Sequence, residues 1–78
     1  MRYHNFWIKF KEYAVQNEDA FSSSYLLKSV IHLIKENPNI TLIGLAGILD
    51  TDAVYLAKYL KYIYKSVIEK ERNSRLLP

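Results

Sequence analysis

The sequence predicts an all-α domain of four helices, in which the C-terminal segment either extends the last helix or forms a short β-hairpin. Apolar residues recur at helical spacing in four segments, and polar or proline-containing breaks separate these segments. Half of the 78 residues are hydrophobic and none is cysteine. One small core without disulfides must therefore hold the chain together, and we treat residues 1–78 as a single domain.

Residues 1–16 predict an amphipathic N-terminal helix. Its aromatic residues follow the i, i+3, i+4, i+7 pattern, whereas Lys9, Lys11 and Glu12 lie off this stripe. The stripe is expected to contact either the chain's own core or a second subunit, since three further helices can close a core without it. The candidate residues of a dimer interface are Phe6, Trp7, Phe10 and Tyr13.

Residues 22–66 predict a core of three helices. The first of them, roughly residues 23–36, follows a polar connector and has a wide apolar arc. Ser22 or Ser23 is expected to cap it, because a serine hydroxyl can accept a hydrogen bond from an amide of the first turn. Pro38 ends it, since proline disfavours helical geometry in the preceding residue.

The pattern of a helix-turn-helix extends over residues 40–63. Thr41 is expected to cap a short helix, and Ala46 lies where two helices can approach closely. Asp50 occupies the corner, where a left-handed backbone is common and aspartate tolerates it better than most residues. Asp52 is then placed to cap the longer helix that follows.

Basic residues are concentrated at the C-terminal end. Residues 1–52 have five basic and six acidic side chains, a net charge of −1, whereas residues 53–78 have six basic and two acidic, a net charge of +4. A basic surplus on the last helix suits contact with a phosphate backbone. An ordinary solvated helix face gives the same pattern, so both interpretations stay open.

Residues 27–61 resemble the helix-turn-helix core of bacterial and archaeal winged-helix regulators, of the MarR and ArsR types, and one half of an AraC-type DNA-binding domain. The matching features are an Asn/Pro loop, a Thr-capped helix with Leu45-Ala46, then Leu49, and a last helix with Leu60-Lys61. The resemblance implies a recognition helix that faces DNA.

Two interpretations compete for residues 67–78. Val67–Glu71 and Arg75–Leu77 have the composition of two strands closed around a short turn, as in the wing of a winged helix. Alternatively, the apolar spacing of the preceding residues extends the last helix to about Glu71. The glycine that usually precedes the first wing strand is missing.

The candidate DNA-contacting residues lie mainly on the outward face of the last helix, where Ala57 is also expected. Over residues 53–62 this face has no Arg, Asn or Gln, the side chains that make bidentate base contacts, and two aspartates precede it. Backbone contact is therefore expected rather than readout of sequence. The candidates are Thr41, Ala53, Val54, Tyr55, Lys58, Lys61, Tyr62, Lys65, Arg72 and Arg75.

Ile43, Gly44 and Gly47 depart from the family pattern, because their positions in the short helix are normally polar and solvent-facing. Two glycines inside a helix cost roughly 1 kcal/mol each relative to alanine. Close packing against the N-terminal helix or a second protein is expected to compensate. These three residues are therefore candidates for a protein interface.

No catalytic, metal or cofactor motif is visible; His32, for example, has no second ligand at suitable spacing. The longest apolar run, residues 40–49, is about half the ~20 residues that cross a bilayer. We therefore expect a cytoplasmic protein that is not an enzyme: a dimeric transcription regulator that binds duplex DNA. The alternative is a winged-helix protein–protein interaction module, acting as an accessory subunit of a DNA replication or transcription complex.

Overall fold

The computed structural model describes the backbone of residues 3–76 and the side chains of residues 3–73, and most of this part of the chain is helical. The all-α prediction is confirmed, and no strand occurs within residues 3–76. The elements are α1 (His4–Gln16), the 3-10 helix η1 (Glu18–Phe21), α2 (Tyr25–Glu36), α3 (Leu42–Ile48) and α4 (Ala53–Leu76).

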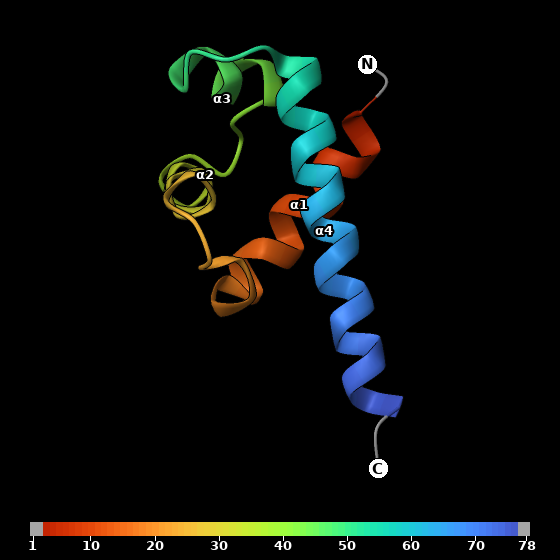
Figure 1. Cartoon of the computed structure of the whole chain (residues 1–78). Coiled ribbons are helices and arrows are strands. Elements are labelled where there is room, and N and C mark those ends of the chain that lie inside the picture. Colours follow the sequence, from red (N-terminus) through yellow and green to blue (C-terminus); the bar gives the residue numbers. More distant parts are fainter. Residues whose placement is uncertain (1–2, 77–78) are drawn as a thin grey trace.

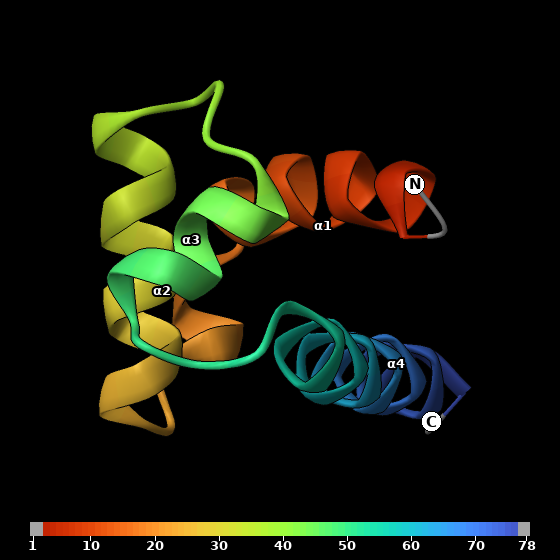
Figure 2. The same ribbon diagram turned by 90° about the horizontal axis from the view of Figure 1, so that it is seen from above.

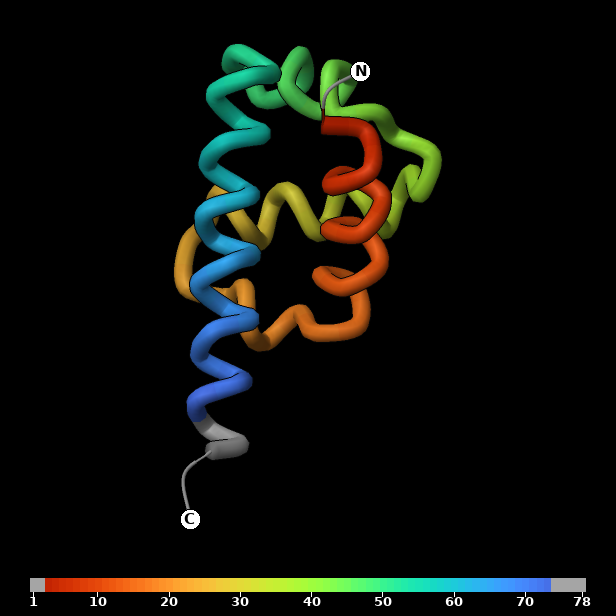
Figure 3. Tube along the Cα trace, turned by 90° about the vertical axis from the view of Figure 1, so that its right-hand side faces the viewer, coloured from red at the N-terminus to blue at the C-terminus, as the bar shows by residue number. Residues whose placement is uncertain are grey.

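The helices form two layers. The first contains α1 and α4, which lie side by side and run in the same direction (Figure 3). In the second layer, α2 runs across both of them, and α3 lies at the end of the molecule where α4 begins (Figures 1 and 2). Because α4 continues past the end of α1, the molecule is elongated, with extents of 44 × 24 × 19 Å.

An aromatic cluster at the centre of the core contains the stripe of α1. The ring of Phe10 is fully buried, and its centroid lies 5.6 Å from that of Phe21, 5.8 Å from that of Trp7 and 6.3 Å from that of Tyr64. The indole N–H of Trp7 donates a hydrogen bond of 3.0 Å to the carbonyl oxygen of Ile40, which ties α1 to the segment before α3.

The prediction that this stripe forms a dimer interface is wrong for Trp7 and Phe10, because both side chains are buried within the chain. Phe6 and Tyr13 are half-buried and pack against the same core. The physical reason is that α2, α3 and α4 leave one side of their core open, and α1 covers it. The N-terminal helix therefore completes the fold.

The corner between α3 and α4 matches the prediction in its local chemistry. The hydroxyl of Thr41 accepts a hydrogen bond of 2.9 Å from the amide of Gly44, and a carboxylate oxygen of Asp52 accepts one of 2.9 Å from the amide of Tyr55. Asp50 has a φ of 55°, in the left-handed region. These local signals confirm a break between two separate helices.

The start of α2 differs from the prediction. Its cap is Ser24, whose hydroxyl accepts a hydrogen bond from the amide of Leu27, whereas the hydroxyl of Ser22 donates to the carbonyl of Asp19. Ser22 and Ser23 lie in a turn that follows η1. The 3-10 helix η1 ends at Phe21, whose ring is fully buried, and α2 begins only after the turn that follows this residue.

The β-hairpin interpretation of the C-terminal segment is wrong within residues 67–76, since α4 continues through Leu76, beyond the expected end at Glu71. Val67 packs against the core one turn after Ile63, and the hydroxyl of Tyr13 donates a hydrogen bond to the carboxylate of Glu71. These contacts favour continued helix. The side chain of Arg75, and Leu77, lie outside the described residues.

Candidate functional site

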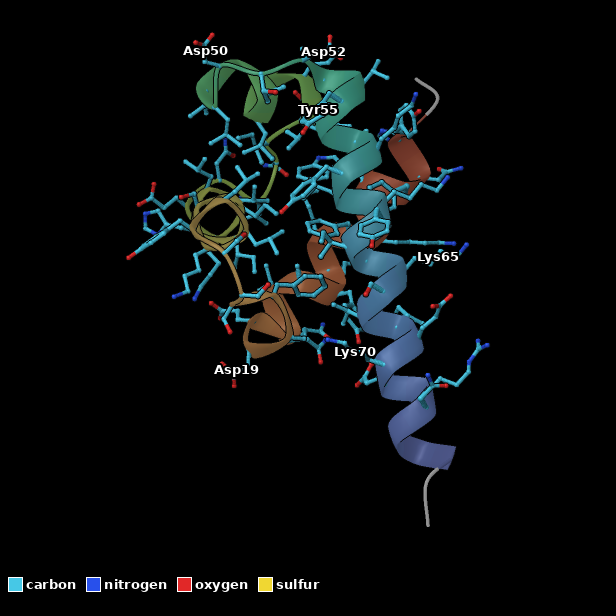
Figure 4. All side chains as sticks on the ribbon, in the orientation of Figure 1. Asp19, Asp50, Asp52, Tyr55, Lys65 and Lys70 are labelled. Atoms are coloured by element: carbon cyan, nitrogen blue, oxygen red, sulfur yellow. The ribbon has the colours of Figure 1, made fainter. Side chains whose placement is uncertain are left out.

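Four cationic side chains lie along the exposed side of α4 and form what we call the basic stripe. They are separated by three, four and seven residues, intervals that place side chains on one face of a helix. All four are exposed, and Lys65 projects from the side of α4 that faces away from α2 (Figure 4). The basic stripe consists of Lys58, Lys61, Lys65 and Arg72.

The charges of the basic stripe have no acidic partner among the side chains of residues 3–73. The ion pairs in this range join Lys35 to Glu18, at 3.0 Å, and His32 to Glu36, at 2.9 Å, and neither involves α4. Glu69 lies on the same exposed side and reduces the local positive charge, and no ion pair between side chains of residues 3–73 includes it. The cations of the basic stripe are therefore available to bind an anionic ligand.

Two tyrosines flank the basic stripe. Tyr55 is 65% exposed and Tyr62 is 72% exposed, and their separation of seven residues places them on the same side of α4. Within residues 3–73 neither ring contacts another aromatic ring or a cation. By contrast, Tyr59 and Tyr64 of the same helix pack against the core.

Other predicted contact residues lie elsewhere. Ala57 is fully buried, so its expected outward position is wrong, and Ala53 is half-buried against the core. Both belong to the inward pattern that continues at Leu60. Thr41 lines a hollow beside Trp7 on α1, and the structure therefore does not place it with the basic stripe. Of the remaining candidates, Val54 is exposed, at 47%.

Negative charge lies at the beginning of α4. Asp50 and Asp52 are exposed at the end of the molecule where α3 meets α4 (Figure 4). The carboxylate of Asp52 already occupies the first turn, because it accepts a hydrogen bond from the amide of Tyr55. A phosphate is therefore repelled from this end and attracted toward residues 58–72.

The exposed side of α3 is uncharged. Ile43 and Ile48 are each 61% exposed, and a Cβ added at Gly47 would meet nothing within 4 Å. A Cβ at Gly44 would lie 3.1 Å from the capping hydroxyl of Thr41. The expectation that α1 packs closely on these glycines is therefore wrong.

We call this surface the α3 face. Ile48 was not predicted to belong to this surface, although an apolar residue directly after Gly47 was visible in the sequence. The α3 face consists of Ile43, Gly44, Gly47 and Ile48.

The described residues contain no cluster of three His, Asp or Glu suited to a metal ion. Their helices also include none with the length and apolar character required to cross a bilayer. The chain matches no known family model, and neither a curated protein nor a solved structure is significantly similar to it. The surfaces of the molecule itself are therefore the indication of its function.

Proposed function

We propose that this chain is a small transcription regulator that binds duplex DNA largely through the phosphate backbone, in the cytoplasm and without enzymatic activity. The observation that carries the proposal is the basic stripe of α4, whose cations are exposed on one face and unpaired within the described residues. Each such cation that approaches a phosphate releases condensed counterions, which favours binding.

Phosphate contact fits this face better than readout of bases. Lysine is a flexible point charge, whereas recognition of a base edge generally uses the planar groups of Arg, Asn or Gln. Three of the four cations are lysines. The aspartates near the start of α4 also weaken insertion of that end into a groove. The proposed contacts are therefore independent of base sequence.

The dependence of affinity on salt tests this proposal. With four phosphate contacts, the logarithm of the association constant is expected to fall against the logarithm of salt concentration with a slope of about −3 to −4. Fluorescence anisotropy with a labelled duplex measures it, and a second duplex of scrambled sequence is expected to bind within about threefold. A slope near zero, or no binding to either duplex at low salt, would contradict the proposal.

A second candidate function is protein recognition through the α3 face, as an accessory subunit or between two copies of the chain. It is favoured by Ile43 and Ile48, which are exposed although apolar, and by Gly47, which has open space beside it. An uncharged helix face with small residues allows close approach of an apolar partner surface. The buried aromatic stripe of α1 does not offer such a surface.

Substitutions on the α3 face test this second candidate. Ile43→Glu and Gly47→Arg are expected to retain the fold, since both side chains enter solvent, and Gly47→Arg removes a helical glycine. Each of the two variants is expected to lose self-association, measured by sedimentation, and capture of a protein partner. The control variant Lys28→Glu on α2 is expected to retain self-association and capture. Equal capture by the wild-type chain and Ile43→Glu would exclude the α3 face.

A further inference from the structure

Tyr55 and Tyr62 present two aromatic rings beside a row of cations, and neither ring has an aromatic or cationic partner among the described side chains. Each has a lysine three residues further along the helix, Lys58 for the first and Lys65 for the second, and residues at this interval are neighbours on a helix surface. Lys58 also lies four residues before Tyr62. Rings and amines therefore occupy adjacent strips along the exposed side of α4.

We propose that this combined surface binds single-stranded nucleic acid, with phosphates along the basic stripe and unpaired bases stacked on Tyr55 and Tyr62. The inference relies on the proposed function for its phosphate contacts and adds a separate role for the rings. Proteins that hold single strands without sequence preference combine a positive surface with aromatic side chains, because every base has an aromatic face.

The spacing of the two rings suits a single strand and not a duplex. Seven residues of α-helix correspond to a rise of about 10.5 Å, so the two rings are separated along the helix by roughly the span of a few nucleotides. In a duplex, the faces of the bases are covered by their neighbours in the stack. A duplex can therefore use only the tyrosine hydroxyls, as donors to phosphate.

The two tyrosines are not equivalent. The amide of Tyr55 donates to the carboxylate of Asp52, so a negative charge lies within the same helical turn. Tyr62 lies further from this carboxylate, between Lys58 and Lys65 on the exposed side. The strand is therefore held more firmly at Tyr62, and the larger loss of affinity follows its removal.

Tyr25 of α2 provides a matched control. It is 88% exposed and has a lysine at the same interval, since the amine of Lys28 lies 5.7 Å from the centroid of its ring. It differs in lying outside the basic stripe, on another helix. If exposed tyrosines act nonspecifically, then Tyr25→Ser weakens binding as much as Tyr62→Ser.

The experiment compares the affinities of a labelled oligothymidine of about 15 nucleotides and a duplex for the same variants. Tyr62→Ser is expected to weaken binding of the single strand roughly tenfold, and Tyr55→Ser to weaken it less. Tyr62→Phe, which keeps the ring and removes the hydroxyl, is expected to remain within about twofold of the wild type. Tyr25→Ser is expected to bind both ligands as the wild type does. Tyr62→Ser is expected to lose much less affinity for the duplex than for the single strand, because a duplex can use only the hydroxyl of Tyr62.

Each contrary result has a distinct meaning. If the wild-type chain binds both ligands and Tyr62→Ser binds the single strand equally well, stacking is excluded while the phosphate contacts stand. If Tyr62→Phe loses as much as Tyr62→Ser, the hydroxyl is the contact, and the inference is overturned. If neither ligand binds at low salt, the proposed function fails and this inference fails with it. Circular dichroism verifies that each variant is folded.

Discussion

The Lys58→Glu/Lys61→Glu double variant is expected to lose binding to duplex DNA at low salt, with an affinity lowered on the order of a hundredfold or more. The change removes the first two cations of the basic stripe and places two carboxylates against the phosphates. The slope of affinity against salt is also expected to become shallower by about 2. Both side chains are exposed, so the free energy of unfolding should change little.

A charge-matched control separates local contact from general electrostatics. Lys9→Glu/Lys28→Glu changes the net charge by the same amount, but at exposed positions of α1 and α2. This control is expected to retain most of the affinity for the duplex. If both double variants lose affinity equally, the effect comes from the overall charge of the chain, and α4 is not the contact surface.

Phe10→Ala is expected to lower the free energy of unfolding by about 3–5 kcal/mol. Phe10 is fully buried between α1, η1 and α4, and its removal leaves a cavity lined by Phe21, Trp7 and Tyr64. A single domain has a total stability of roughly 5–15 kcal/mol, so this loss is a large share of it. Urea denaturation followed by circular dichroism measures the change.

Phe6→Ala on the same helix serves as the comparison, because Phe6 is only half-buried. It is expected to cost less than Phe10→Ala. If α1 instead contributed its aromatic rings to a dimer interface, the midpoint of unfolding of the wild-type chain would increase with protein concentration, and Phe10→Ala would remove that dependence. A midpoint independent of concentration agrees with a core inside one chain.

The sequence predicted those parts of the fold that are fixed by local chemistry. Capping by Thr41 and Asp52 requires only an oxygen three residues before a free amide, and the left-handed Asp50 requires only a residue that tolerates this conformation. The apolar spacing also identified the four helices. These signals depend on neighbours in the chain and are visible without knowledge of packing.

Features that depend on distant contacts were not predictable in this way. The 3-10 helix before α2 exists because Phe21 is buried against Phe10 and Tyr13, two residues of another helix. The length of α4 is supported by contacts such as that between Tyr13 and Glu71, 58 residues apart in the chain. A short sequence window contains neither piece of information.

For the candidate site, the sequence predicted the exposure of some residues correctly and that of others wrongly. Lys58, Lys61 and Lys65 are exposed on one side of α4, as the spacing indicated, whereas Ala57 is turned inward by the same helical pattern. Gly47 was recognised as unusual, but only the structure distinguishes open space from a tight contact at this position. A glycine alone is compatible with both.

Trp7 gives the protein an optical reporter of its own. It is the single tryptophan of the chain, its indole is stacked on Phe10, and its N–H is bonded to the carbonyl of Ile40. Its fluorescence therefore reports whether α1 remains packed against the segment before α3. Because the indole is buried and lies on a different helix from Tyr55 and Tyr62, its emission reports loosening of the core in an unlabelled sample.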